Sequence, residues 1–253
     1  GKFDFIHDSE GGDDYIYLAE KLRTLSGKKL QSKRNLVNRF KAAYEGRWSY
    51  EDMTRENIKD AFAFHIHWCN LNGCARERDF EGETCAIVQA LHNFDYLNLR
   101  GGLLRLDGEV IAFTFGCKAT PDMFVVQIEK ADHTIQGAYQ MINQQFVQRN
   151  CNDVEYVNRE EDLGLEGLRQ SKLSYHPLFL QPKLTAQRLT EEQLQLRALW
   201  LACFPEDTQD DVEQFLLSRY DERRCLVARR DGRIAAMLHI VPFRDTAYIY
   251  AVA

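Results

Sequence analysis

The sequence predicts a mixed α/β (α+β) fold built from two related units, each with a β-sheet flanked by helices. The first observation is a hairpin pattern that occurs twice, with Asp107-Gly108 and Asp231-Gly232 each lying between two apolar runs. Asp-Gly between such runs is the strongest short-range hairpin signal, because a type I′ turn needs φ > 0 at both central positions. From Asp107 to Asp231 the offset is 124 residues, about one domain length. The second observation is that strand and helix patterns alternate after the first hairpin, which is typical of a sheet covered by helices.

Before the first hairpin, the spacing of apolar residues predicts one short strand and three helices. The stripe formed by Val37, Phe40 and Tyr44 marks the buried side of the first long helix, and its basic residues lie away from that stripe. We expect Thr54 to cap the next helix. The expected ranges are a strand over 14–18 and helices over 30–44, 54–71 and 83–93.

After the first hairpin, which spans roughly 97–116, the patterns predict three strands and two helices of the first unit. We expect Thr134 to cap the first of these helices. In the second unit, Thr190-Glu191-Glu192-Gln193 is a capping box, which predicts the start of a helix. The expected ranges are strands over 123–128, 154–157 and 177–183, helices over 134–149, 163–171, 190–203 and from 210 onward, then the second hairpin and a strand over 247–253.

The composition is that of an ordinary soluble chain without a membrane segment, and we expect a cytoplasmic protein. The 253 residues are 45% hydrophobic and 28% charged, and no apolar run approaches the ~20 residues of a membrane helix. The seven cysteines are irregularly spaced, which indicates reduced thiols rather than a disulfide framework. No terminating signal follows the last apolar run, so we expect the parent protein to continue past Ala253.

A basic segment stands out against the net charge of −6. Residues 21–41 contain no acidic residue, whereas an ordinary solvated helix face mixes both signs. The segment is either a surface helix facing water or an anion-binding face for phosphates or a nucleic-acid backbone. Its basic residues are Lys21, Arg23, Lys28, Lys29, Lys33, Arg34, Arg39 and Lys41.

The densest polar stretch runs from Asn158 to Arg169, directly after a strand pattern. The carboxyl ends of strands are where ligand sites of α/β proteins gather. Three consecutive acids there, Glu160, Glu161 and Asp162, would repel one another unless cations or a ligand ammonium compensate them. The alternative is a solvated helix cap.

Residues on both sides of this stretch are candidates for the same cleft. Glu129 ends the preceding strand pattern and could face the acids. Arg169, Lys172 and Tyr175 lie one and two helical turns beyond them. They could orient the carboxylates or bind phosphate, and Tyr175 could equally belong to the core.

A metal site is the weaker interpretation of a local group of His and Cys. His65 and Cys69 would share one helical face, but His67 points elsewhere and Cys74 lies past the expected helix end. We therefore expect no metal. The glycine-rich loops that bind nucleotide phosphates or dinucleotides, the nucleophile elbow of serine esterases and the His-Glu-x-x-His pair are also missing from the sequence.

The segment Gly167–Pro177 resembles the C-terminal domain of bacterial phosphatidylglycerol lysyltransferases, and most closely an uncharacterised bacterial branch of that family. There a Gly-Leu-Arg-x-x-Lys helix is followed by an aromatic residue, a proline and a strand, as in Gly167-Leu168-Arg169-Gln170-Ser171-Lys172-Leu173-Ser174-Tyr175-His176-Pro177. The run from Gly27 to Phe40 also resembles the family's basic helix. Together the resemblance covers about residues 14–184.

The resemblance implies tandem domains of the acetyltransferase-like (GNAT) superfamily, related to the Fem-type transferases that take an aminoacyl group from aminoacyl-tRNA. It implies a first domain over 1–185, with most of its upstream half missing from this chain, and the front half of a second GNAT domain over 186–253. The turn that binds acetyl-CoA in GNAT enzymes matches Asp132–Ala138 here, which has one glycine and no basic residue. Acetyl-CoA is therefore a candidate cofactor of the C-terminal unit only.

The leading hypothesis from the resemblance is aminoacyl transfer from an aminoacyl-tRNA to an amine or hydroxyl of a small molecule, peptide or lipid head group. Lys33, Arg34 and Arg39 are the candidates for binding phosphates. The candidates for binding the α-ammonium or accepting the proton of the nucleophile are Glu129, Glu160, Glu161 and Asp162, with Asn158, Arg169, Lys172 and Tyr175 as further substrate-binding residues.

Two alternatives remain open. One is acetyl-CoA-dependent N-acetylation by the C-terminal unit, with the first domain recognising the substrate. The other is a degenerate GNAT pair that binds a ligand without catalysis. This alternative would predict the loss of the glycine-rich turn in the first unit.

Overall fold

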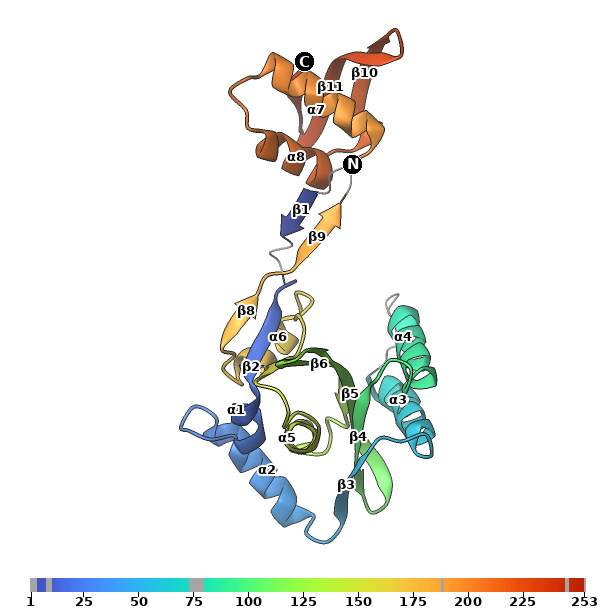
Figure 1. Cartoon of the computed structure of the whole chain (residues 1–253), viewed down its shortest axis with the longest axis vertical. Coiled ribbons are helices and arrows are strands. Elements are labelled where there is room, and N and C mark those ends of the chain that lie inside the picture. Colours follow the sequence, from blue (N-terminus) through green and yellow to red (C-terminus); the bar gives the residue numbers. More distant parts are fainter. Residues whose placement is uncertain (1–3, 8–10, 73–79, 188, 244–245, 253) are drawn as a thin grey trace. The chain divides into compact units, whose positions relative to one another are not determined.

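The computed structural model describes residues 4–7, 11–72, 80–187, 189–243 and 246–252. The chain divides into two compact units, residues 9–182 in one and residues 1–8 with 183–253 in the other (Figure 1). The predicted mixed α/β architecture is confirmed: the larger unit holds a mixed seven-stranded sheet flanked by helices. None of the helices in the described residues is long and apolar enough to cross a bilayer.

The sheet of the larger unit has the strand order β3-β4-β5-β6-β7-β2-β8. All neighbouring strands are antiparallel except β6 and β7, which are parallel. The strands are β2 (Asp14–Leu18), β3 (Trp48–Asp52), β4 (Arg100–Leu106), β5 (Glu109–Thr120), β6 (Met123–Ala131), β7 (Tyr156–Asn158) and β8 (Phe179–Gln181). The helices are α1 (Ala19–Thr24), α2 (Gln31–Ala43), α3 (Ile58–Asn72), α4 (Phe80–His92), α5 (Ala138–Asn150) and α6 (Glu166–Leu173).

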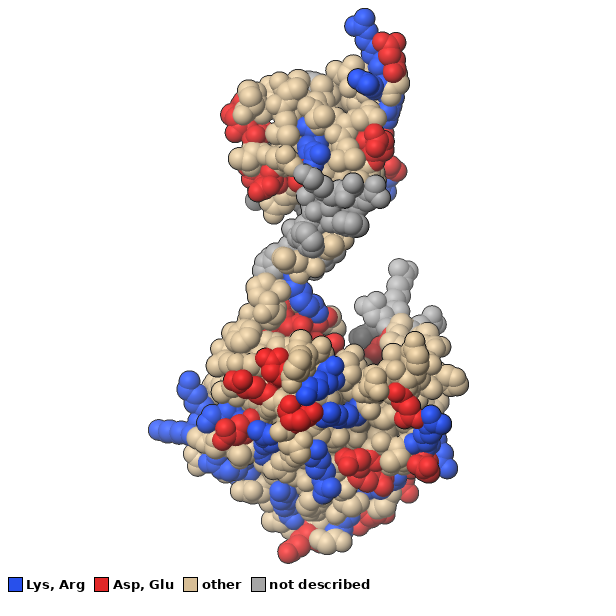
Figure 2. Space-filling view, in the orientation of Figure 1, with Lys and Arg blue, Asp and Glu red and all other residues tan. Residues whose placement is uncertain are grey.

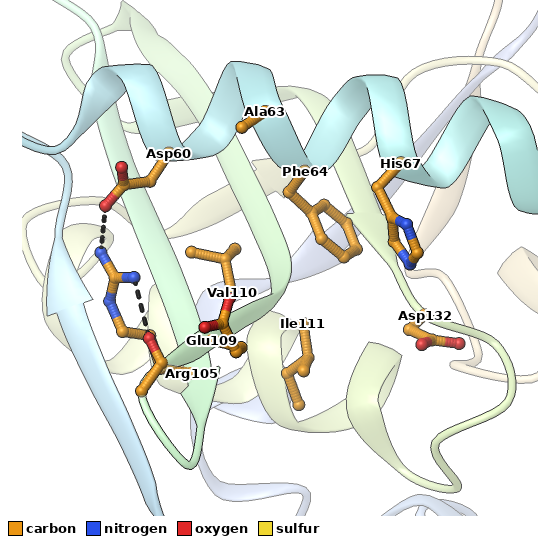
Figure 3. A pocket seen from close by; sticks show the side chains of 10 residues that line it. Asp60, Ala63, Phe64, His67, Arg105, Glu109, Val110, Ile111 and Asp132 are labelled. Carbon is orange, nitrogen blue, oxygen red and sulfur yellow. Dashed lines mark hydrogen bonds and ion pairs between the residues drawn. The ribbon is translucent and has the colours of Figure 1, made fainter.

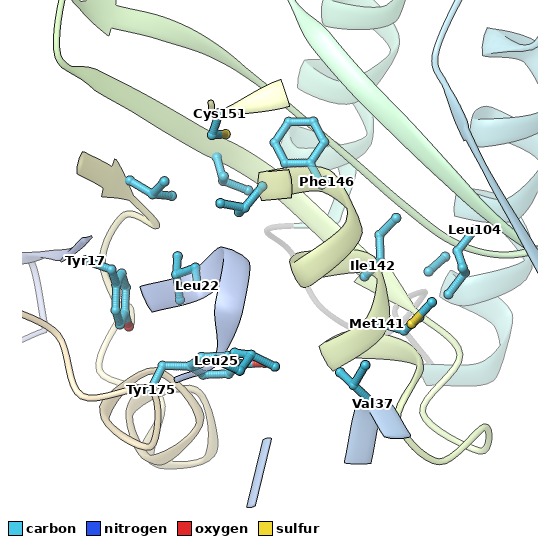
Figure 4. Close-up of a cluster of buried hydrophobic side chains, with 14 of the residues drawn as sticks. Tyr17, Leu22, Leu25, Val37, Leu104, Met141, Ile142, Phe146, Cys151 and Tyr175 are labelled. Atoms are coloured by element: carbon cyan, nitrogen blue, oxygen red, sulfur yellow. The ribbon is translucent and has the colours of Figure 1, made fainter. Parts of the chain in front are cut away.

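The two faces of this sheet carry separate hydrophobic clusters. Helices α1, α2 and α5 cover one face, and α3 and α4 cover the other (Figure 1). Successive strand residues point to opposite faces, so Ala112 belongs to the first cluster and Phe113 to the second. In the first cluster, shown in Figure 4, the ring of Phe146 packs against Phe124 with centroids 5.6 Å apart.

Both predicted Asp-Gly hairpins are confirmed as type I′ turns. Their central residues have φ angles of 52° and 87° at Asp107 and Gly108, and 51° and 77° at Asp231 and Gly232. The strand registers also shift at matching places, after Leu104 in the first hairpin and after Ala228 in the second. Each shift lies three residues before the Asp of its turn.

The smaller unit contains a second sheet with the order β10-β11-β12 and a two-stranded ribbon, β1-β9. Its helix α7 (Glu191–Cys203) begins with the predicted capping box, in which Thr190 and Gln193 bond each other's backbone N–H groups. The core of this unit surrounds Leu196 and Leu216. The remaining elements are β1 (Asp4–His7), β9 (Leu184–Gln187), α8 (Gln209–Ser218), β10 (Cys225–Arg230), β11 (Arg233–Phe243) and β12 (Thr246–Val252).

Several element boundaries differ from the sequence prediction, and α1 and β3 were not predicted. Helix α5 begins at Ala138 instead of Thr134, because Asp132 accepts hydrogen bonds from the backbone N–H and hydroxyl of Thr134 and holds a turn there. Helix α3 begins at Ile58, after a turn in which the Asn57 side chain accepts from the backbone N–H of Thr54. The strand predicted over 177–183 is shorter in the structure: β8 ends at Gln181, before Pro182, which has no N–H to continue a ladder. The strand β9, over Leu184–Gln187, was not predicted.

Asp162 anchors the loop that follows β7. Its two oxygens accept hydrogen bonds from the Tyr15 hydroxyl at 2.6 Å and from the Arg169 guanidinium at 2.9 and 3.1 Å. The backbone N–H of Gly164 also donates to it, at 2.9 Å. Arg169 and Tyr15 together hold the pKa of this carboxyl well below its usual range. The loop is thereby tied to β2 on one side and α6 on the other.

We expect Phe146→Ala to destabilise the larger unit by about 3–5 kcal/mol, because the ring is fully buried and its removal leaves a cavity. Phe62→Ala is the matched control, since this ring is 38% exposed on α3. Urea unfolding followed by peptide-resolved hydrogen exchange would report the larger unit separately. Equal losses for the two variants would contradict this account of the core.

We expect Asp162→Asn to lower stability at pH 7 by about 2 kcal/mol, the scale of a hydrogen bond to a charged group. The native pKa is depressed, so the contribution of the carboxylate is present above the unfolded pKa of about 3.9 and lost as pH falls below it. The gap between wild type and variant should therefore shrink from about pH 5 downward. Asp122→Asn is the control, because its contact with the Thr120 hydroxyl can be kept by an amide oxygen. A stability difference between wild type and Asp162→Asn that stays constant with pH would refute the role assigned to the Asp162 carboxylate.

Candidate active site

The candidate site lies where the parallel strands β6 and β7 separate. The described strands pair only through Met123–Val125 and Tyr156–Asn158, and β6 then continues alone on this side to Ala131. Immediately beyond the last pair, β6 contains a bulge: Ile128 faces Phe115 and Val126 faces Gly116, which leaves Gln127 out of the ladder. A bulge leaves its extra residue unpaired and is common beside active sites.

A pocket of about 240 Å³ occupies this gap. It lies below the roughly 300–1,000 Å³ of sites for drug-sized ligands, so it suits a small group. Its walls come from β6, from the turn after β7 and from α6, with α4 and α5 contributing one residue each.

A buried ion pair bridges the gap between the two strands. Arg159, just after β7, donates to Glu129 of β6 at 2.8 Å, and the two side chains are only 11% and 10% exposed. Asn143 of α5 donates to the second oxygen of Glu129 at 2.8 Å. The Arg159 guanidinium also lies 4.9 Å from the ring centroid of Tyr175 and 5.8 Å from that of Tyr17. Burial raises the pKa of both phenols.

One N–H group of this pair is unused. The Nη1 atom of Arg159 is buried and has no hydrogen-bond partner among the described residues. Leaving a buried donor unsatisfied costs about 1–3 kcal/mol, and more for a charged group. Arg159 lines the pocket, but solvent does not reach Nη1 itself, so a ligand oxygen could bind this atom only after the surrounding side chains shift.

Lys172 holds the acidic turn in place. Its ammonium donates to the backbone carbonyls of Arg159, Glu160 and Glu161 at 2.5, 3.0 and 2.5 Å. Asn158 adds a second restraint, because its side-chain oxygen accepts from the backbone N–H of Glu160 at 2.7 Å. Burial, with the nearby Arg159 charge, lowers the pKa of Lys172 to about 8. The half-buried side chains of Glu160 and Glu161 line the pocket.

A second ion pair lines the pocket. The buried Lys130 of β6 contacts the exposed Glu83 of α4 at 2.9 Å, and its ammonium lies 3.6 Å from the ring centroid of Trp68. His65 is buried nearby, and its ring contacts the Thr84 hydroxyl at 3.1 Å. Cys74 lies outside the described residues, and no group of three or more potential metal ligands occurs within them.

The basic residues of α2 have three different surroundings. The Lys33 ammonium lies 4.7 Å from the ring centroid of Tyr175, and burial lowers its pKa. Arg34 donates to the backbone carbonyls of Leu25 and Gly27 at 2.5 and 3.4 Å, so it stabilises the preceding loop. Arg39 is exposed.

The structure brings four of the eleven residues singled out from the sequence into one pocket. Glu129, Glu160, Glu161 and Lys172 line one pocket, whereas Asp162 and Arg169 line a separate small hollow with Tyr15. Sequence reasoning assigned no role to Arg159, Asn143 or Lys130. The sequence did contain a signal for Arg159. This residue lies two positions after the buried Val157, and residues two apart in a strand lie on the same face of the sheet.

Another hollow, of about 530 Å³, lies between α3 and the β4–β5 hairpin (Figure 3). The Arg105 guanidinium in this hollow forms ion pairs with Asp60 at 2.6 Å and with Glu51 at 2.5 Å. Arg105 also donates to the carbonyl of Gly108. Because these charges are neutralised within the protein, this hollow is the weaker candidate.

Comparison with known proteins places the chain in a family. The family model described as "Phosphatidylglycerol lysyltransferase, C-terminal" matches residues 4–187. An uncharacterised protein of Mycoplasmoides gallisepticum, MYCGA3080, is 26% identical over 186 residues, which are 71% of this chain and 57% of that protein.

Two solved structures are also similar. A conserved protein of unknown function from Bacteroides thetaiotaomicron is 44% identical, with a TM-score of 0.69, over 73% of this chain and 62% of that one. The L-PGS structure from Bacillus licheniformis is 17% identical, with a TM-score of 0.50, over 74% of this chain and 62% of that one, and shares the fold. The chain thus spans about 57–62% of the length of these relatives. The resemblance carried by Gly167–Pro177 is confirmed by the family match over residues 4–187, and the chain belongs to the family of phosphatidylglycerol lysyltransferase C-terminal domains.

Proposed function

We propose that the larger unit transfers an aminoacyl group from an aminoacyl-tRNA to an amine or hydroxyl acceptor. The observation that carries this proposal is the pocket at the separation of β6 and β7, where the bulge at Gln127, the unused N–H of Arg159 and two carboxylates come together. Membership in a family described by a lysyltransferase supports the same class of reaction.

In this reaction the nucleophile attacks the carbonyl carbon of the aminoacyl ester. A new C–N or C–O bond forms, and the ester bond to the terminal ribose breaks. The nucleophile loses its proton to a pocket carboxylate, and the resulting carboxyl group gives this proton to the ribose oxygen as it leaves. Holding both substrates in one site supplies much of the rate enhancement.

We propose two donors for the oxyanion of the tetrahedral intermediate. One is the backbone N–H of Gln127, the extra residue of the bulge, which lines the pocket. The other is Nη1 of Arg159, which has no hydrogen-bond partner among the described residues. Preorganised donors of this kind contribute most where water is excluded. Glu129 positions Arg159 and does not itself meet the substrate, because Arg159 and Asn143 occupy its two oxygens.

Glu160 and Glu161 are the carboxylates proposed to meet the substrate. One binds the α-ammonium of the aminoacyl group, and the other accepts the proton of the nucleophile. Lys172 and Asn158 act as positioning residues, since both bind the backbone of this turn. Asp162 and Arg169 fix the next part of the loop.

We expect Glu160→Gln and Glu161→Gln each to impair transfer, but in different ways. Loss of the ammonium contact should raise KM, whereas loss of the proton acceptor should lower kcat by about 10²–10⁴-fold. The measurement is transfer of radiolabelled amino acids from a mixed pool of charged bacterial tRNAs, with phosphatidylglycerol vesicles or a mixture of amines and peptides as acceptors. Glu45→Gln removes an exposed acid of the same unit and should change nothing. Normal kinetics in both pocket variants would overturn the assignment.

We expect Arg159→Lys to lower kcat by about 10²–10³-fold, the usual cost of removing one oxyanion donor. The variant keeps a positive charge beside Glu129, so it should still fold. Arg55→Lys is the control, because Arg55 is an exposed arginine that also pairs with an aspartate. A loss seen only in KM, or an equal loss in the control, would show that Arg159 is not a donor to the transition state.

A further inference from the structure

A second pocket, of about 340 Å³, lies between the α1–α2 loop and the segment that follows α6. We call it the lysine pocket, because Lys21, Lys28 and Lys29 line it together with His176. Its remaining walls include Tyr17 and Tyr175, and none of its lining residues is acidic.

The loop that carries these lysines is rigidly built. Leu25 and Gly27 have φ angles of 49° and 93°, and the Arg34 guanidinium binds the carbonyls of both residues. Leu25 and Leu30 are buried at the two ends of the loop. The backbone is therefore anchored, while the side chains of Lys28 and Lys29 are exposed to solvent.

The lysine pocket shares a wall with the candidate active site. Tyr175 lines the lysine pocket, and its ring contacts Arg159, which lines the active-site pocket. The Tyr17 hydroxyl donates to the carbonyl of Lys172 at 2.8 Å, which connects the same two pockets. The buried side chains of Tyr175 and Arg159 thus form the layer between the two pockets.

Basic residues also lie outside the lysine pocket, on α2. Lys33 and Lys41 continue the positive charge along one side of α2, a helix of 13 residues, or about 20 Å, and Arg39 lies on another side. Figure 2 shows Lys and Arg side chains gathered over the region of α1 and α2, although the chain as a whole has a net charge of −6. A single phosphate would need only one pocket, whereas a row of cations suits a polyanion.

We propose that the lysine pocket binds backbone phosphates near the 3′ end of an RNA substrate, with Lys21, Lys28 and Lys29 as the contacts. The choice of RNA rests on the proposed aminoacyl transfer. The pocket would then hold the RNA strand while its terminal aminoacyl ester enters the neighbouring site.

The test is binding of a fluorescein-labelled RNA minihelix, an acceptor stem ending in single-stranded CCA, to the full chain by fluorescence anisotropy at several salt concentrations. Each lysine–phosphate contact contributes about 0.7 to the slope of log K against log salt, or roughly 5-fold in affinity at 0.1 M. Lys28→Ala and Lys29→Ala should each raise Kd by that factor, and the double variant by roughly 25-fold, with a slope lower by about 1.4. Lys59→Ala is the matched control, because it removes an exposed lysine on α3.

Equal weakening by Lys59→Ala, or an unchanged salt slope in the double variant, would overturn the proposal. So would lysine-dependent sedimentation with phosphatidylglycerol vesicles in the absence of any RNA effect, since that result would assign the pocket to a lipid. The minihelix carries no amino acid, so binding is read independently of catalysis. Lysine-dependent RNA binding without any transfer would refute the proposed function alone, and normal transfer with unchanged RNA affinity in the double variant would refute the lysine pocket alone.

Discussion

The ion pair between Glu129 and Arg159 is the interaction on which the candidate site depends. The parallel pairing of β6 and β7 ends at Val125 and Asn158, where β7 itself ends, and β6 continues without this neighbour to Ala131. The pair crosses this opening at 2.8 Å and takes the place of a ladder bond. Removing one partner would leave a buried charge, which typically costs about 3–5 kcal/mol. Polar groups therefore fill the gap between β6 and the turn that follows β7. A pocket forms there, whereas a continuous sheet would leave no space for one.

The matching irregularities of the two sheets show how such a gap can be encoded. In the larger unit the register shifts between Phe115 and Gly116, and in the smaller unit between His239 and Ile240. Each shift follows its Asp-Gly turn by the same number of residues. A bulge increases the local twist and leaves one residue unpaired. The hairpin and the bulge after it recur at the same spacing in both units. This indicates that local backbone geometry sets the place where β6 and β12 bend.

Sequence patterns of a few residues predicted the turns and the helix cap, but they did not predict contacts between residues far apart in the sequence. The two Asp-Gly turns and the capping box at Thr190 depend on residues a few positions apart, so they could be read directly. One partner of Asp162 is Tyr15, 147 positions away, and Asp4 of β1 pairs with Gln187 of β9. Such contacts depend on strand order, which hydrophobic spacing does not specify. The acidic turn was predicted as a site, but its division into roles required the side-chain partners.

That division follows from how the repulsion among three consecutive acids is relieved. Arg169 and Tyr15 take up the charge of Asp162. Lys172 brings a second cation to the turn but spends its three N–H bonds on backbone carbonyls, so it fixes the main chain and leaves the neighbouring carboxylates at the pocket. Lys172 and Arg169 therefore act mainly by holding the geometry of this turn, from which Glu160 and Glu161 line the pocket.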